Sequence, residues 1–404
     1  MRKFSLVAAL LLALPLAAPA QEPDAALGAA GGTNGMAWKL VRASGAGNAI
    51  VSPVSVWEAL AMTHAGARGA TAAEIARVLG MPDDRATIAA ASQALRKELA
   101  AAKGKKIALD VANRLWVQQG KRLEGEFIRL LEEKFGAGAG IVDFGNATEA
   151  ARKEINRWVR DRTAKKIDEL LKPDVLSPRP GLVVTNAVYM KAAWESRFKK
   201  AATAREPFRL AAGEKADVPF MHRAGKMTAG RAGKGPSAVT LCVLPYAGEQ
   251  LAMVVIVPDA VDGLATVLGG LDGIPLDVWR HTGVLRKQQV NLAVPKWKAR
   301  RALALNDALA SMGMKQAFES GVADFSGIDG TRELFVSAVV HEGFVDVGEE
   351  GTEAAAFTFA LPEVGAAMQP PKPLEVRADR PFAWAVVHQG TGAVLFAGTV
   401  TDPR

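Results

Sequence analysis

The sequence predicts an α+β fold, in which a mainly helical N-terminal part is followed by a part dominated by β-strands. Residues 24–120 are rich in alanine and follow mostly helical hydrophobic patterns. After residue 180, most apolar runs are short and are separated by turn residues, as is typical of strands. Helical and strand patterns do not alternate regularly and no repeat of fixed period occurs, so large sheets with segregated helices are favoured over a doubly wound arrangement.

Three helices can be assigned from local signals. Ser52-Pro53 places a cap and a first-turn proline before the largely apolar run 54–62, which predicts a buried helix. A second helix is expected over 71–79, where Thr71 and Glu74 have capping-box spacing and Gly80 follows as a terminator. The third expected helix covers 147–162.

That third helix is amphipathic, because one face collects apolar residues while the other is highly charged. The apolar face consists of Ala151, Ile155, Trp158 and Val159. The predicted strands are apolar runs bounded by turn residues, and they cover 107–117, 182–190, 241–245, 251–257, 290–295, 334–347, 382–387 and 394–400.

Residues 1–20 have the order of a secretory signal. Two basic residues, Arg2 and Lys3, precede an apolar run at 4–16, and the small-residue sequence Ala18-Pro19-Ala20 follows. We expect cleavage after Ala20 and a protein that is secreted or periplasmic. The apolar run is shorter than the roughly 20 residues of a spanning helix, and no later run approaches that length, so no membrane association is expected.

Residues 21–404 are expected to form one domain. The chain has 404 residues, of which 49% are hydrophobic and 23% charged, so it can bury a large core. No Ser/Gly-rich or Pro-rich linker occurs between residues 25 and 350. The sequence also carries no signal for oligomerisation, and we therefore expect a monomer.

The charge pattern argues against nucleic-acid binding. The net charge is +8, but the basic clusters at 103–106, 152–166 and 296–301 lack regular aromatic interleaving or a nucleic-acid motif. These clusters are best interpreted as solvated faces. The single cysteine, Cys242, lies between Leu241 and Val243 and is expected to be a buried core residue.

A hydrolase is the alternative from another functional class, and the sequence lacks its motifs. There is no G-x-S-x-G, no β-lactamase motif set and no H-E-x-x-H, since His341-Glu342 continues as Gly343-Phe344-Val345. The other four histidines have no companion at metal-ligand spacing. We therefore assign no catalytic residue, no metal site and no cofactor.

The segment 349–361 has an unusual alternation. Its even positions from Thr352 to Ala360 are all small, while the odd positions include Phe357, Phe359 and Leu361. As a strand, this segment would have one slim face able to slide between neighbouring strands in a packed sheet.

Prolines dominate the stretch that follows. Pro362, Pro370, Pro371 and Pro373 exclude regular sheet ladders, so we expect the chain to form an exposed loop up to about residue 377. Loops longer than about 12 to 15 residues are uncommon and are usually functional or disordered. A flexible surface connection is the alternative interpretation of this segment.

The segment 349–356, Glu-Glu-Gly-Thr-Glu-Ala-Ala-Ala, resembles the hinge of an inhibitory serpin. Three further stretches resemble this family in the same order along the chain. Residues 48–56 resemble its first buried helix entry, 185–198 its central-sheet strand and following turn, and 379–398 its C-terminal signature. Together, the matches run from about residue 30 to residue 403.

The resemblance implies a serpin fold of three β-sheets with about eight or nine helices and an exposed reactive-centre loop at about 349–377. It implies a suicide-type inhibitor whose loop is cleaved by a serine protease, after which the hinge inserts as a new strand in the main sheet. The acylated protease would be distorted during insertion, so that hydrolysis of the acyl-enzyme stalls.

Residue roles follow from the same resemblance. Gly351 is the expected pivot of the hinge, because glycine tolerates backbone angles that other residues do not. Lys296 and Glu349 match a pair that ties the hinge base to a neighbouring strand. The remaining hinge residues are Thr352, Glu353, Ala354, Ala355, Ala356 and Thr358. The residues expected to control sheet opening are Ser52, Ser55, Asn186, Trp194 and His341.

Family spacing places the scissile bond between Gly365 and Ala366, with Val364, Ala367 and Met368 as alternative specificity residues. Small and apolar residues fill this window, and no Arg or Lys occurs in it. The expected partner is therefore a serine protease that prefers small or apolar residues, elastase-like or subtilisin-like. The alternative within the family is a non-inhibitory serpin acting as carrier, chaperone or protease substrate, and Pro362 favours it because proline would end an inserted strand early.

Overall fold

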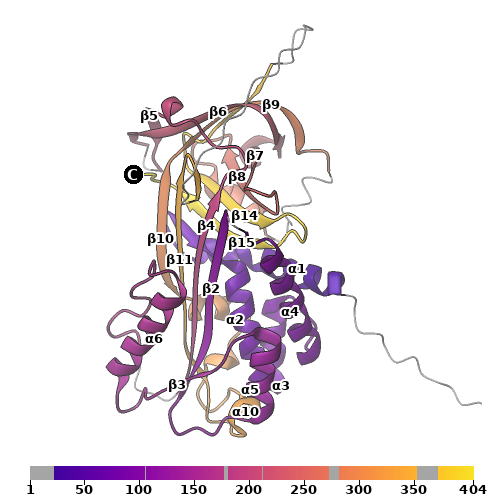
Figure 1. Cartoon of the computed structure of the whole chain (residues 1–404), viewed down its shortest axis with the longest axis vertical. Coiled ribbons are helices and arrows are strands. Elements are labelled where there is room, and N and C mark those ends of the chain that lie inside the picture. The colour runs from indigo at the N-terminus through magenta and orange to yellow at the C-terminus, as the bar shows by residue number, and fades with distance from the viewer. Residues whose placement is uncertain (1–21, 105, 177–180, 212, 273–281, 353–371) are drawn as a thin grey trace, which may run out of the picture.

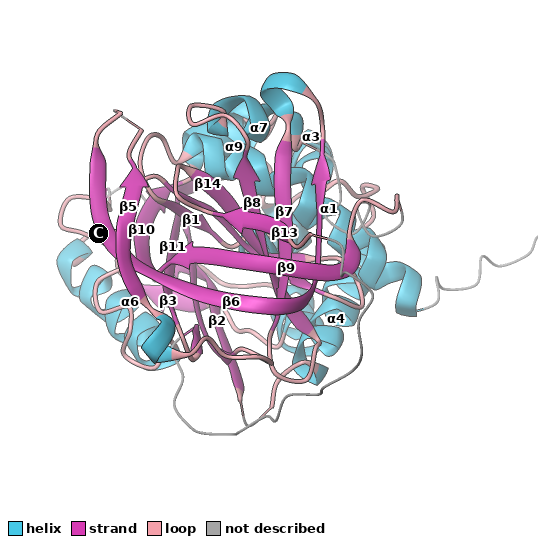
Figure 2. Cartoon of the chain, turned by 90° about the horizontal axis from the view of Figure 1, so that it is seen from above, coloured by secondary structure: helices cyan, strands magenta, loops and turns pink. Residues whose placement is uncertain are grey.

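The computed structural model describes residues 22–104, 106–176, 181–211, 213–272, 282–352 and 372–404. These residues contain helices and two large sheets, which confirms the predicted α+β class (Figures 1 and 2). The α-helices of the described part are α1 (Glu22–Ala43), α2 (Pro53–Gly66), α3 (Gly69–Leu79), α4 (Arg85–Ala101), α5 (Gly125–Leu130), α6 (Thr148–Arg162), α7 (Leu264–Gly270), α9 (Asn306–Ser311) and α10 (Ser326–Asp329).

The first sheet has six strands and forms the long axis of the molecule (Figure 1). In spatial order it contains β10 (Trp297–Ala304), β11 (Val336–Gly348), β12 (Gly351–Thr352), β4 (Leu182–Ala193), β2 (Ile107–Gln118) and β3 (Gly140–Val142). Helices α1 to α5 gather on one side of this sheet, and α6 lies on the other (Figure 1).

The second sheet has nine strands and lies in the upper part of the molecule in Figure 1; Figure 2 shows several of its strands from above. In spatial order it contains β1 (Ala49–Val51), β15 (Val394–Val400), β14 (Phe382–His388), β8 (Leu251–Pro258), β7 (Val239–Pro245), β6 (Lys215–Ala232), β9 (Arg286–Pro295) and β13 (Leu374–Arg377), and β5 (Ala204–Arg209) pairs with β6.

The family resemblance implied three sheets, whereas the described strands form two hydrogen-bonded sheets. The reason is the length of β6, which spans 18 residues. Its N-terminal end pairs with β5, its middle with β9 and its C-terminal end with β7. One continuous strand thus joins two groups of strands that would otherwise count as separate sheets.

Helix α2 lies at the centre of the molecule. All 14 of its residues are buried, as the apolar run predicted. The local signals also act as expected, because the Ser52 side chain accepts a hydrogen bond from the Ser55 N–H and Pro53 occupies the first turn. This helix carries polar side chains toward the strands of the six-stranded sheet.

The predicted capping box of α3 is wrong. The helix begins at Gly69, two residues before Thr71, and no side chain caps its first turn. Thr71 Oγ1 instead accepts a hydrogen bond from the Asp324 N–H, and Glu74 accepts two from the N–H groups of residues 315 and 316. Tertiary contacts therefore take both side chains. The predicted end at Gly80 is confirmed, with a left-handed φ of 66°.

The strands predicted from residue 182 onward are all present, with ends that differ from the predicted ones by at most four residues. The strand predicted over 334–347 begins two residues later, at Val336. Strands β5, β6, β10 and β13 were not predicted, because charged and small residues interrupt their apolar positions. Strands β1 and β3 were also not predicted, and each has only three residues. The predicted helix over 147–162 is α6, with Ala151, Ile155 and Val159 buried and Trp158 partly exposed. Cys242 is fully buried, as expected.

The predicted loop range of 349–377 is too wide at both ends. Gly351 and Thr352 form β12 inside the six-stranded sheet, and residues 374–377 form β13, which pairs in parallel with β9. Pro373 did not prevent this strand, because a proline directly before an edge strand removes no ladder hydrogen bond. The structure gives no description of residues 353–371.

Candidate functional site

Strands β4 and β11 pair in parallel, and the hinge lies at one end of the boundary between them. Residues 336–344 of β11 pair directly with 182–189 of β4. Beyond that stretch, β12 lies between the two strands, because Thr352 is the Cα partner of both Ala192 and Val347. Strand β12 is antiparallel to both neighbours and so runs toward their direct pairing. Extending it in the same register would require β4 and β11 to separate.

Gly351 begins this short strand in a conformation that requires glycine. Its φ is 149°, which side chains rarely allow. A Cβ atom there would lie 2.1 Å from the Ala192 carbonyl oxygen and 2.6 Å from the Ala193 Cα. Position 351 therefore sets how closely the hinge approaches β4.

Thr352 is fully buried, and its hydroxyl lies 2.9 Å from the Tyr246 hydroxyl. Burial raises the pKa of Tyr246 far above its ordinary value, so the phenol stays neutral. The Tyr246 ring stacks on Trp194 with ring centres 4.5 Å apart. Trp194 in turn donates from Nε1 to the Gly348 carbonyl at 2.9 Å. Two aromatic rings thus support the first residues of the hinge.

Two carboxylates tie down the base of the hinge. Glu349 forms an ion pair with Lys296 at 2.9 Å and accepts a hydrogen bond from Thr203 at 3.0 Å. The predicted pair of Lys296 and Glu349 is therefore confirmed. Partial burial acts to raise the pKa of Glu349, but these hydrogen bonds outweigh it and lower the pKa. Glu350 lies 2.9 Å from Arg197 and 3.3 Å from Lys200.

A buried polar cluster crosses the same boundary about midway along the strands. His341 of β11 and Asn186 of β4 are Cα partners, and Asn186 is also the partner of Asn113 on β2. The three side chains therefore form a row across three strands. Ser52 and Ser55, at the start of α2, form hydrogen bonds with this row. The Ser52 N–H donates to His341 Nε2 at 3.1 Å, and Asn186 Nδ2 donates to Ser55 Oγ at 2.6 Å.

The hydrogen bonds of this polar cluster fix the state of the histidine. Complete burial lowers the pKa of His341 to about 3, so the ring is neutral at ordinary pH. Its Nε2 accepts from the Ser52 N–H, and its Nδ1–H therefore donates to Asn186 Oδ1. Asn186 Nδ2 also donates to Asn113 Oδ1 at 2.8 Å. Asn113 Nδ2 in turn donates to Glu58 Oε2 at 3.3 Å.

Four of the five residues predicted to control sheet opening lie together in this polar cluster. They are Ser52, Ser55, Asn186 and His341. Trp194 lies apart from them, at the end of the boundary where β12 enters.

Sequence reasoning missed Asn113, Glu58 and Tyr246. A signal for Asn113 exists in the strand pattern, because the inward positions 107, 109, 111, 115 and 117 are all apolar and only position 113 is an amide. Glu58 is likewise the single charged residue in the apolar run of α2 before His64. Nothing in the local sequence marks Tyr246, because its partners lie far away in the chain.

The remaining predicted site residues lie outside the described residues. They are the hinge residues Glu353, Ala354, Ala355, Ala356 and Thr358, and the cleavage-site residues Val364, Gly365, Ala366, Ala367 and Met368. In the part of the chain that the structure describes, no group of three or more His, Cys, Asp or Glu side chains is arranged to hold a metal ion. No helix of that part has the length and apolar character needed to cross a membrane.

Comparison with known proteins gives consistent results. The sequence model of a family described as "Serpin (serine protease inhibitor)" matches residues 34–403. An uncharacterised serpin-like protein of Thermococcus kodakarensis is 38% identical over 363 residues, covering 88% of this chain and 81% of that protein. Human leukocyte elastase inhibitor is 34% identical over 89% of this chain and 94% of its own length.

A solved structure agrees with these matches. The chain is similar to the crystal structure of Serpin48 from the insect Tenebrio molitor, with a TM-score of 0.80 and 29% sequence identity. The match covers 95% of this chain and 98% of that protein. The hinge at the top of β4 and β11, the polar cluster below it and these matches lead to one conclusion: this chain belongs to the serpin family.

Proposed function

We propose that this protein inhibits serine proteases by loop cleavage, covalent trapping of the acyl-enzyme and insertion of the hinge as a strand between β4 and β11. The observation that carries the proposal is the position of β12. Gly351 and Thr352 already occupy the first two positions between these strands, and the chain runs along their boundary. Cleavage would free one end of the loop, and further residues could then add to β12 in the same register.

The composition of the hinge supports insertion. Thr352 packs with no exposed surface against Tyr246, so the inserting face has little room for large side chains. The following residues on that face are Ala354, Ala356 and Thr358, all small. Each inserted residue would place its N–H and C=O groups in ladder hydrogen bonds with β4 and β11. Withdrawing the strand would break all of these hydrogen bonds, so insertion would be hard to reverse.

We propose a target protease of elastase-like or subtilisin-like specificity. The support is the loop sequence, in which small and apolar residues surround the expected bond between Gly365 and Ala366. The name of the human relative, leukocyte elastase inhibitor, is consistent with such a target.

We further propose that the protein is exported, through a signal cleaved after Ala20, and that it acts as a monomer.

A non-inhibitory role is the second candidate, and Pro362 is the observation that favours it. Proline cannot donate to a sheet ladder, so insertion would stop near that residue. A carrier or a plain protease substrate would then share the fold without trapping its protease.

The test is to incubate the protein from residue 21 onward with pancreatic elastase and, separately, with subtilisin. A denaturing gel shows whether a stable covalent adduct forms, and mass spectrometry identifies the released C-terminal peptide. We expect an adduct together with a peptide beginning at Ala366. Cleavage without an adduct by both proteases, and with no rise in the melting temperature of the cleaved protein, would exclude the inhibitory mechanism.

Two adjacent substitutions provide a matched control. Ala354→Arg places a large charge on the face predicted to enter the sheet, whereas Ala355→Arg places the same charge on the opposite face. We expect the first variant to be cleaved as a substrate with little adduct, and the second to keep most of its inhibition. Equal loss in both variants would contradict insertion in this register.

A further inference from the structure

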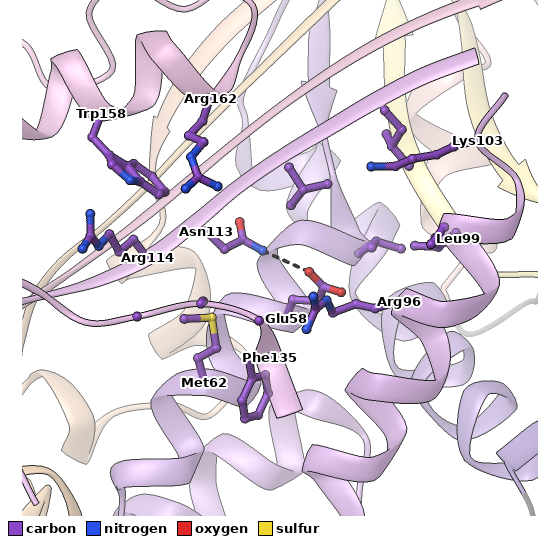
Figure 3. Close-up of a pocket in the computed structure, with 17 residues that line it drawn as sticks. Glu58, Met62, Arg96, Leu99, Lys103, Asn113, Arg114, Phe135, Trp158 and Arg162 are labelled. Atoms are coloured by element: carbon purple, nitrogen blue, oxygen red, sulfur yellow. Dashed lines mark hydrogen bonds between the residues drawn. The ribbon is translucent and has the colours of Figure 1, made fainter. Parts of the chain in front are cut away.

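A cavity of about 330 Å³ lies along β2 of the six-stranded sheet, between α2 and α4 on one side and the end of α6 on the other. Side chains of α2, α4, β2 and α6 line it, together with the short segment 135–138 (Figure 3). Its volume falls at the lower end of the range of small-molecule pockets in proteins, roughly 300 to 1,000 Å³. Such a cavity can hold a compact ligand but not a polymer.

Four cationic side chains line this cavity, and they come from three elements and the turn after α4. Arg96 comes from α4, Lys103 from the following turn, Arg114 from β2 and Arg162 from the end of α6 (Figure 3). Among the described residues, no carboxylate forms an ion pair with any of the four within 4.0 Å. Arg96 and Arg114 each donate to a neutral partner, the carbonyls of Lys134 and Ala139. Glu154 attracts Arg114 from outside the cavity lining, but it forms no ion pair with it, so the charge around the cavity is net positive.

Arg114 and Arg162 are held in place rather than free. Both guanidinium groups lie against the Trp158 ring, at 5.3 and 5.7 Å from its centre. Arg114 also lies 4.7 Å from the ring centre of Trp116. Burial lowers the pKa of Arg114, and the neighbouring positive charge of Arg162 lowers it further. The two arginines therefore repel each other, and an anion placed between them would relieve that repulsion.

Glu58 of α2 is the one carboxyl among the described residues that line the cavity. Burial raises its pKa to about 7, although Arg96, Asn113 and Lys103 act in the opposite direction. Glu58 is thus close to half protonated at neutral pH and offsets little of the positive charge around it. When protonated, it can also donate a hydrogen bond to a ligand oxygen.

We propose that this cavity is a binding site for a compact organic dianion, specifically a small phosphate ester. The planar guanidinium groups match the oxygens of a phosphate group, which can accept two hydrogen bonds from one arginine. The remaining lining is apolar, and includes Met62, Leu99 and Phe135 (Figure 3), so it suits the carbon part of such an ester.

The site is joined to the polar cluster under the sheet. Asn113 lines the cavity and donates to Glu58, and it also accepts from Asn186 on β4. A ligand that contacts Glu58 or Asn113 therefore stabilises the arrangement of α2, β2 and β4 described here. We expect a bound phosphate ester to slow hinge insertion, and this second part rests on the proposed function.

The experiment is isothermal titration of the protein with glucose 6-phosphate at low salt, with glucose as the uncharged comparison. We expect saturable binding of one phosphate ester per chain and no heat from glucose. Lys103→Gln and Arg162→Gln remove exposed cations of the cavity and should each weaken binding by about fivefold or more, which is about 1 kcal/mol. Because both side chains are largely solvent-exposed, we expect the variants to stay folded.

Arg157→Gln is the matched control. Arg157 is an exposed arginine of the same helix, α6, but does not line this cavity. The variant should bind as the unchanged protein does, within twofold. Equal weakening by Arg157→Gln and Arg162→Gln would mean diffuse attraction to a basic surface, and would overturn the proposal, as would the absence of saturable binding.

Glu58→Gln sharpens the assignment. At pH 8 the glutamate is mostly ionised and opposes an anion, so its replacement should tighten binding several-fold; at pH 6 the two proteins should bind alike. Unchanged or weaker binding by the variant at pH 8 would contradict the site.

These titrations involve no protease, so they stand even if the protein fails to inhibit one. The effect on insertion is then measured separately, as the rate of adduct formation with and without glucose 6-phosphate.

Discussion

The two sheets of this protein bury very different surfaces. In the nine-stranded sheet, every residue of β8, β14 and β15 is buried, and nearly all of these residues are apolar. In the six-stranded sheet, the boundary of β4 and β11 rests on the polar row of Asn113, Asn186 and His341. An apolar interior resists any rearrangement that opens a cavity, whereas a hydrogen-bonded boundary can exchange one set of partners for another. The difference indicates which part of the fold is built to move.

The largest expected effect is in the nine-stranded sheet. Trp384 of β14 is fully buried, and its ring lies 6.2 Å from that of Trp297. Trp384→Ala should reduce the free energy of unfolding by about 3–5 kcal/mol, because it removes a large apolar contact and leaves a cavity. Urea unfolding of the intact and the loop-cleaved protein measures this, and both forms should lose similar amounts. A loss confined to the intact form would contradict the comparison.

The polar boundary should behave differently. Asn186→Ala deprives His341, Ser55 and Asn113 of hydrogen-bond partners. The intact protein should lose about 2–3 kcal/mol of unfolding free energy, since buried polar groups are left unsatisfied. We expect a smaller loss in the cleaved protein, in which the inserted strand separates β4 from β11. Lys191→Ala, at an exposed position on the same strand, is the control and should have little effect on either form.

The free energy of unfolding should depend on pH in opposite ways through His341 and Glu58, the two buried titratable groups of the polar cluster. Between pH 6.5 and about 3 the unfolded state binds a proton at His341 that the folded state does not, so the stability falls as pH is lowered through that range. Glu58 has the opposite sign: between pH 7 and 4.5 the folded state binds the extra proton, and the stability rises as pH is lowered. The two contributions oppose each other from about pH 6.5 to 4.5.

Glu58→Gln should remove the stabilising contribution of Glu58 and leave that of His341 unopposed. As pH is lowered from 6.5 to 4.5, the unfolding free energy of the variant should decrease, relative to that of the unchanged protein, by up to about 1.4 kcal/mol for each pH unit. Chemical unfolding at a series of pH values gives the difference between the two proteins, in which all other carboxylates cancel. Parallel pH profiles would show that Glu58 does not take up a proton on folding.

The smallest expected effect is at the hinge base. Lys296 is 41% exposed, so its ion pair with Glu349 is partly screened by water. Lys296→Met should cost about 0.5–1 kcal/mol in unfolding free energy, but it should speed hinge insertion, because one of the contacts that hold Glu349 is lost. Lys298→Met serves for comparison, because Lys298 is an exposed residue of β10, two residues after Lys296, and pairs with Asp346 rather than with Glu349. Equal insertion rates in the two variants would argue against a tethering role.

Much of this arrangement was predictable because its signals are local. The buried helix α2 follows from Ser52-Pro53 and the apolar run behind it, and the hinge was recognisable from Gly351 and the small residues after it. The capping box at Thr71 failed for the converse reason: residues 315, 316 and 324 compete for the same side chains, and their proximity is not encoded in the helix itself.

By itself, the sequence determined the α+β class, the burial of Cys242, the family resemblance and the positions of β4, β7, β8, β9, β11, β14 and β15. These depend on periodicity and short motifs, which act over a few residues. Only the tertiary structure decided that Asn113 and Glu58 extend the polar cluster, that Tyr246 receives Thr352, and that β12 already lies between β4 and β11. The contacts of Glu58 with Asn113, of Tyr246 with Thr352 and of β12 with β4 each join residues more than 50 positions apart in the chain. The packing of distant elements therefore has to bring these partners together before the contacts can form.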